Sequence, residues 1–164
     1  MKRHNYFAYG ANVNQEYFKS QFPDAELIGV GVVPDHAIIF NKPSTDGSGK
    51  ASIIPSAAFV EGLLWSLPEE AFKKLDKIES GYNKVKLMVH HYKGGMYSNE
   101  PEGILAVTYL ARSLNPHVLP NDTYMTKIIV GATDNKFLPD YIKSLRKIPI
   151  MTYVNLKPYA PVEF

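Results

Sequence analysis

One glutamate, Glu79, has the position of a possible acid–base group. The segment 68–79, PEEAFKKLDKIE, carries apolar residues at helical spacing and predicts an amphipathic helix. At about 100° per residue, Glu79 lies roughly 50° from the centre of the apolar stripe, on its inward shoulder. It also falls in the last predicted turn, where the helix dipole disfavours a negative side chain. Partial burial and the dipole both raise a carboxyl pKa, so this segment predicts a group that exchanges protons near neutral pH. The alternative is a glutamate whose stem follows the core edge while its head reaches solvent.

A second candidate site is the turn that ends the first predicted strand. Residues 6–14, YFAYGANVN, pass from an apolar, β-prone run to Gly10 and then to a helix-compatible stretch. A strand that ends in a glycine turn before a helix presents free backbone N–H groups, which can hold a carboxylate or an oxyanion. Gly10 would allow close approach of the backbone or a positive φ. The simpler alternative is an ordinary strand–turn–helix connection with Asn12 as the helix N-cap.

Strands outnumber helices among the elements that must position these groups. Ser66 and Glu69 have the spacing of a capping box for the helix at 68–79. Most connections are short, which predicts an α+β fold with a mixed, largely antiparallel sheet or small β-barrel and a few packed helices. The predicted strands are 5–9, 27–33, 36–40, 51–55, 59–67, 84–92 and 104–111, and the predicted helices are 13–22, 68–79, 121–132 and 138–148.

Length and composition exclude several classes of function. The 164 residues predict a single domain, 1–164, with a Pro- and Tyr-rich tail from about residue 149. The net charge of +2, without a cluster of basic residues, gives no reason to expect nucleic acid as a partner. Cysteine is absent, which excludes disulfides, thiolate metal sites and cysteine nucleophiles. No apolar run approaches the length of a membrane span, so we expect a cytoplasmic protein that does not enter a membrane.

Three sequence blocks resemble the γ-glutamylcyclotransferases. The blocks are YFAYGAN, GLLWSLPEEAFKKLDKIE and TYMTKIIVGATDNKFLPDYIKSL. The family pattern is an N-terminal YFAYGSN turn, then G-x-x-W … LD-x-x-E, then Y … GA … LP-x-Y. The blocks occur in the same order here, and the match extends over most of the chain. The resemblance implies a small mixed barrel-like fold and an enzyme that releases an amine or amino acid from a γ-glutamyl compound, leaving 5-oxoproline, with no metal or cofactor.

The resemblance also implies roles for individual residues. Glu79 matches the catalytic glutamate of the family. Ala11 stands where the family usually has serine. If the turn binds substrate through backbone N–H groups, this difference has no effect. If the serine hydroxyl contacts substrate in the family, the alanine alters affinity or substrate range. The spacing from the glutamate to Tyr82 is shorter than in the family pattern. The residues that match substrate-binding positions are Tyr9, Gly10, Ala11, Asn12, Tyr82, Tyr109 and Tyr124.

The predicted reaction is attack of the substrate's own α-amine on its γ-carbonyl, with Glu79 as general acid and base. The sequence does not distinguish an amino acid from an amine as the leaving group. The alternative function is a non-catalytic protein on the same fold that binds or senses a small molecule. We expect a small-molecule γ-glutamyl substrate as the partner, and either a monomer or a homodimer.

Overall fold

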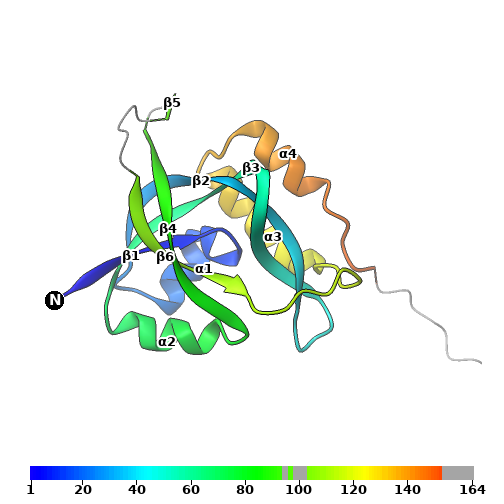
Figure 1. Ribbon diagram of the computed structural model, residues 1–164, viewed down its shortest axis with the longest axis horizontal. Coiled ribbons are helices and arrows are strands. Elements are labelled where there is room, and N and C mark those ends of the chain that lie inside the picture. Colours follow the sequence, from blue (N-terminus) through cyan, green and yellow to red (C-terminus); the bar gives the residue numbers. More distant parts are fainter. Residues whose placement is uncertain (94–95, 98–102, 153–164) are drawn as a thin grey trace, which may run out of the picture.

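The computed structural model describes residues 1–93, 96–97 and 103–152 of the chain, and a closed β-barrel forms its centre (Figure 1). The strands are hydrogen-bonded in the order β2-β3-β1-β6-β4, and an additional pairing between β2 and β4 closes the ring. A short strand, β5 (Met96–Tyr97), pairs with the end of β4. The barrel strands are β1 (Arg3–Ala8), β2 (Glu26–Pro43), β3 (Gly49–Pro68), β4 (Tyr82–Lys93) and β6 (Ile104–Ala111).

The barrel is mixed because β1 and β6 run parallel, aligned at Tyr6 and Val107, while its other strand pairs are antiparallel. This confirms the predicted α+β fold with a small, largely antiparallel barrel. β1 lies between β3 and β6, and its last residues are buried on both faces. The turn that follows β1 therefore starts from the most enclosed strand of the barrel.

β2 and β3 form one long hairpin, whereas the sequence predicted four short strands. The prediction placed a break at Pro34 and Asp35 and another after Pro55. The two strands instead stay paired through this region, with Pro34 opposite Phe59 and His36 opposite Pro55, and a register shift absorbs the extra residues. Asp35 takes a φ of 55° at this shift, a conformation that aspartate tolerates better than most residues. Such bulges bend and twist strands, as barrel closure requires.

In the part of the chain that the structure describes, four α-helices pack on the barrel. In Figure 1, α2 lies below the barrel, and α3 and α4 lie together on its right. The predicted capping box at Ser66 and Glu69 is wrong, because β3 continues to Pro68. The Ser66 hydroxyl accepts a hydrogen bond from Arg3 Nε at 2.8 Å, and α2 has no side-chain cap. The helices are α1 (Gln15–Gln21), α2 (Ala71–Ile78), α3 (Asp122–Asp134) and α4 (Pro139–Arg146).

An apolar core fixes α1 and α2 against the barrel. Phe18 of α1 packs on Trp65 of β3, with ring centres 4.8 Å apart, and both side chains are fully buried. Phe72 and Leu75 form the inward face of α2. Burial of one such side chain contributes about 1.5–3 kcal/mol. The end of α2, where Glu79 follows, is therefore held by packing.

The predicted tail from about residue 149 lies mostly outside the described residues. The described part of the chain contains no helix with the length and apolar character that a membrane crossing requires.

Candidate active site

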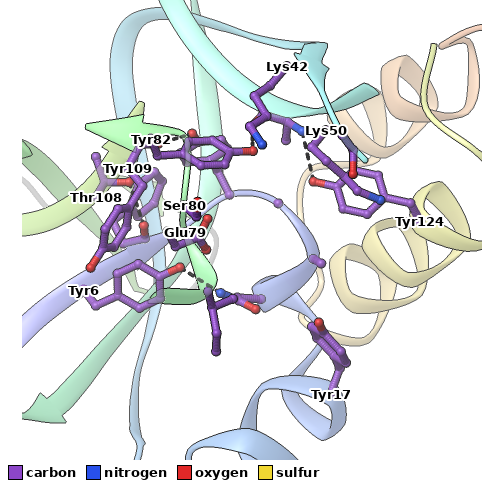
Figure 2. Close-up of a pocket in the computed structure, with 18 residues that line it drawn as sticks. Tyr6, Tyr17, Lys42, Lys50, Glu79, Ser80, Tyr82, Thr108, Tyr109 and Tyr124 are labelled. Atoms are coloured by element: carbon purple, nitrogen blue, oxygen red, sulfur yellow. Dashed lines mark hydrogen bonds between the residues drawn. The ribbon is translucent and has the colours of Figure 1, made fainter. Parts of the chain in front are cut away.

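Glu79 occupies the C-cap of α2, one residue beyond the helix and not within its last turn as predicted. Its backbone N–H still donates to the Leu75 carbonyl at 2.8 Å, so the packing of α2 sets its position. Gly81 then adopts a φ of +87°, which lets the chain turn sharply into β4. Figure 2 shows the Glu79 side chain among the residues that line a cavity.

The Glu79 carboxylate is half-buried and accepts no hydrogen bond from any described residue. Burial raises its pKa to about 7, and the positive charge of Lys42 partly opposes this shift. A carboxylate that loses hydration without gaining donors favours its protonated form. The raised pKa predicted from the helix pattern is confirmed, and burial is its main cause. A carboxyl group with this pKa can both accept and release a proton near neutral pH.

The cavity has a volume of about 220 Å³. This is below the roughly 300–1,000 Å³ of pockets for drug-sized ligands, and it suits a ligand of about dipeptide size. The structure brings all the predicted site residues together around this one cavity, although their chemical roles stay predictions. These residues are Tyr9, Gly10, Ala11, Asn12, Glu79, Tyr82, Tyr109 and Tyr124.

Gly10 forms part of the cavity wall, and close packing explains why it is a glycine. Its φ is −97°, which any residue can adopt. A Cβ at this position would lie 3.0 Å from the Tyr124 hydroxyl and 3.4 Å from the Ala51 side chain. The Tyr124 hydroxyl accepts a hydrogen bond from the Ala51 N–H at 3.0 Å. Tyr124 therefore links α3 to the start of β3 directly over the turn.

Asn12 lies in a short 3₁₀ turn, η1 (Ala11–Val13), and does not cap α1. The cap is Asn14, whose side chain accepts from the Tyr17 N–H at 3.0 Å. The Asn12 side chain instead donates to the Tyr6 hydroxyl at 2.9 Å. Within the described ranges the backbone N–H of Asn12 finds no acceptor. It therefore remains a donor at the cavity wall for an anionic group of a ligand.

Three of the predicted tyrosines present their rings to the cavity but bond their hydroxyls within the protein. Tyr9 donates to the Tyr109 carbonyl. Tyr82 donates to the Ala51 carbonyl at 2.9 Å, and Tyr109 donates to the Asp76 carboxylate at 2.5 Å. Burial raises the pKa of each hydroxyl well above its usual range, so all three stay protonated. These tyrosines shape the cavity without offering it a free hydroxyl.

Tyr6 is a cavity residue that the sequence interpretation missed. Its hydroxyl accepts from Asn12, but its own proton has no acceptor in the part of the chain that the structure describes. Burial, with an added contribution from Glu79, raises its pKa well above the usual range. Tyr6 is therefore a protonated donor close to the carboxylate. Strict alternation along β1 places Tyr6 and Tyr9 on opposite faces, so the sequence alone gave no reason to put both in one site.

Two further cavity residues, Lys42 and Lys50, come from the segment 41–50, where the sequence showed no readable pattern. Among the described residues, no three His, Asp or Glu side chains lie together in an arrangement that could hold a metal ion.

The chain belongs to the AIG2-like family and has the gamma-glutamylcyclotransferase-like fold that the sequence blocks predicted. The family model matches residues 59–145, which are 87 of the 164 residues. The matched range includes Glu79 and three of the predicted tyrosines but not the turn at Gly10. No curated protein shows significant sequence similarity to the chain.

Several solved structures share the fold over nearly the whole chain. A protein named gamma-glutamyl cyclotransferase is 25% identical, with a TM-score of 0.80 and 93% of this chain and 91% of that chain covered. An uncharacterized protein from Homo sapiens is also 25% identical, with a TM-score of 0.81 and coverages of 94% and 92%. A yeast gamma-glutamyl cyclotransferase described as specific to glutathione is 12% identical, with a TM-score of 0.62 and coverages of 88% and 94%; this likeness concerns the fold only.

Proposed function

We propose that the protein is a cyclotransferase that converts a γ-glutamyl amide into 5-oxoproline and a free amine, with Glu79 as the general acid and base. One observation carries the proposal: Glu79 is a half-buried carboxylate with a pKa of about 7 that faces a small cavity and receives no hydrogen bond from the residues that the structure describes. Membership of the AIG2-like family and similarity to a protein named gamma-glutamyl cyclotransferase support it.

The reaction forms one C–N bond and breaks another. The α-nitrogen of the substrate attacks its own γ-carbonyl carbon and closes a five-membered lactam, and the original amide C–N bond then breaks. The α-ammonium loses two protons in total, and the departing nitrogen gains two when it leaves as an ammonium. Glu79 can carry these protons one at a time, so no net proton is consumed at the site. A cavity that holds the compact conformer supplies part of the rate, since well-oriented intramolecular reactions gain about 7–11 kcal/mol.

Two donors in the cavity that contains Glu79 can stabilise the negative charges of the substrate. The Asn12 backbone N–H and the Tyr6 hydroxyl are both free of acceptors among the described residues. They can hold the glutamyl α-carboxylate or the oxygen that becomes negative during attack, where loss of one donor typically costs about 2.7–4 kcal/mol. Ala11 has no hydroxyl to offer, so the turn binds through its backbone.

The test is a direct assay of product. Incubate the protein with γ-glutamyl amino acids, γ-glutamyl amines and glutathione, and measure 5-oxoproline by mass spectrometry. We expect Glu79→Gln to lower kcat by about 10²–10⁴-fold, the range of general acid–base contributions.

Glu61→Gln is the matched control for this substitution. Glu61 is buried, and burial also raises its pKa to about 7, but it holds the N–H of Leu138 and does not line the cavity. This variant should keep its activity. An inactive wild-type protein across the whole panel contradicts the proposal, and tight binding without product, measured by calorimetry, would favour the non-catalytic alternative.

A further inference from the structure

Lys42 and Lys50 form a like-charged pair across the β2–β3 hairpin. They are directly opposite each other in the antiparallel register, and both side chains are half-buried. Like charges at directly opposed positions of two strands destabilise a sheet. Local arrangements that cost stability tend to occur at functional sites. Both lysines line the cavity that contains Glu79.

Carboxylates act on the two ammonium groups only from beyond ion-pair distance, Glu79 on Lys42 and Asp46 on Lys50. Neither forms an ion pair with any residue that the structure describes. Lys42 Nζ lies 5.1 Å from the centre of the Tyr82 ring, and Lys50 Nζ lies 4.3 Å from the centre of the Tyr124 ring. The ring faces therefore hold both ammonium groups at the cavity wall while leaving their N–H donors available.

The surrounding charges show that this part of the cavity favours an anion. Burial lowers the pKa of Lys50, and the positive charges of Lys127 and Lys42 add to this effect against an opposing contribution from Asp46. The Asp46 carboxylate itself already accepts hydrogen bonds from Ser48. An anion placed between the lysines would relieve their repulsion and receive charge-assisted hydrogen bonds.

The position of the lysines relative to Glu79 indicates which part of the substrate carries that anion. Figure 2 shows Lys42 and Lys50 on one side of Glu79 and Tyr6 on the other. In the proposed reaction the glutamyl part occupies the side of Tyr6 and Asn12, where the free donors lie. The leaving part then extends from Glu79 toward the two lysines.

We propose that Lys42 and Lys50 bind a carboxylate on the leaving part of the substrate, so that the protein selects γ-glutamyl conjugates of amino acids or short peptides over conjugates of neutral amines. This inference rests on the proposed cyclotransferase function. In the competing arrangement the lysines hold the α-carboxylate of the glutamyl part, which every γ-glutamyl substrate contains.

A matched pair of substrates separates the two arrangements. γ-Glutamyl-alanine and its C-terminal amide differ only in the charge of the leaving part. We expect kcat/KM of the wild-type protein to favour the acid by about 10–100-fold, as charge-assisted hydrogen bonds typically give. Lys42→Met and Lys50→Met should each lower kcat/KM for the acid by about tenfold relative to the amide, mainly through KM. Lys50→Arg should keep the preference, because the positive charge stays.

The control variant is Lys143→Met, which removes the same charge from the exposed face of α4, away from the cavity. It should leave the preference unchanged. Lys42→Met should also raise the unfolding temperature, since it removes the like-charged pair, and this excludes misfolding as the cause of a lower activity. Equal kcat/KM for acid and amide in the wild-type protein, or equal losses for both substrates in the lysine variants, would overturn the inference.

Calorimetry with the Glu79→Gln variant tests the lysines without turnover. This variant should bind γ-glutamyl-alanine more tightly than its amide, and addition of Lys50→Met should abolish the difference. If the wild-type protein turned over no substrate while this binding preference remained, the catalytic proposal would fail and the role of the lysines would stand. If neither compound bound, or both bound equally, the role of the lysines would be refuted.

Discussion

Replacing Gly10 by alanine tests whether the Tyr124 hydroxyl is the reason for a glycine at this turn. The backbone at Gly10 has a φ of −97°, so it is not the left-handed conformation that favours glycine. The new Cβ would instead lie 3.0 Å from the Tyr124 hydroxyl, closer than the roughly 3.5–4.0 Å at which carbon contacts are most favourable. The hydroxyl must therefore move away from the turn.

A shift of a few tenths of an ångström is needed, and the largest expected cost follows from the hydrogen bond that this movement weakens. The Tyr124 hydroxyl accepts from the buried Ala51 N–H at 3.0 Å, and a buried donor that loses its acceptor costs about 1–3 kcal/mol. We expect Tyr124→Phe to lower the free energy of unfolding by about that amount, and Gly10→Ala to lower it by up to that amount. The double variant should be no less stable than Tyr124→Phe alone, because the added methyl group takes the space that the hydroxyl leaves. The sum of the two single effects should then exceed the effect of the double variant by the cost of Gly10→Ala, up to about 1–3 kcal/mol.

Equilibrium urea unfolding of the four proteins measures this difference. The midpoints should shift at a constant m-value, which shows that the variants change the stability of the native state and not the compactness of the unfolded chain. If the effects of the two substitutions added to within about 0.5 kcal/mol, the two residues would be independent and the steric explanation for Gly10 would be refuted.

Three further predictions concern the titrating groups and the hydroxyls. Burial raises the pKa of Glu61 to about 7 in the folded protein, above its ordinary value of 4.5, so its contribution to stability is complete below about pH 4.5 and is lost as the pH rises through 7. Glu61→Gln should remove on the order of 3 kcal/mol from the difference in unfolding free energy between pH 4.5 and pH 8, measured by urea titration. For activity, kcat/KM should fall as the pH drops below about 7, because Glu79 becomes protonated. Lys42→Met should move this fall in kcat/KM to higher pH, because the Lys42 ammonium no longer favours the Glu79 carboxylate. If the pH of the fall did not change in this variant, Glu79 would not be the titrating base. Tyr6→Phe should lower kcat by about 10–100-fold, whereas Tyr109→Phe should change it little because the Tyr109 hydroxyl is already bonded to protein; equal effects in the kinetic assay would contradict the distinction.

The sequence predicted the features that depend on local pattern. The apolar stripe of α2 depends only on residues within two turns, and it placed Glu79 at the inward shoulder before any tertiary contact was known. The turn at Gly10 was likewise visible as the end of an apolar run. Family resemblance added the tyrosines, which no local pattern could have assigned to one cavity. The structure brings all of these groups to the same cavity.

The features that the sequence did not predict depend on long-range pairing. Lys42 and Lys50 meet only because the β2–β3 hairpin has a specific register, and that register includes irregularities that no residue pattern specifies. Tyr6 reaches the cavity because β1 is enclosed on both faces, which violates the simple alternation of a half-buried strand. The predicted capping box was wrong also because of long-range pairing: β1 pairs with β3 and keeps Ser66 in a strand.

The groups that the fold leaves unsatisfied describe the ligand that would complete them. Among the described residues, the Asn12 N–H and the Tyr6 hydroxyl proton lack acceptors, Glu79 lacks a donor, and two lysines lack counterions. The hydroxyls of Tyr9, Tyr82 and Tyr109 donate to acceptors within the protein and do not add to this deficit. Each polar or charged group without a partner lowers the stability of the folded protein. A ligand with a carboxylate at one end, an ammonium in the middle and a second carboxylate at the other end would provide partners for all of these groups. A γ-glutamyl amino acid has that order of charges, and its binding should therefore raise the unfolding temperature with ligand concentration, as any ligand that binds only the folded state must do.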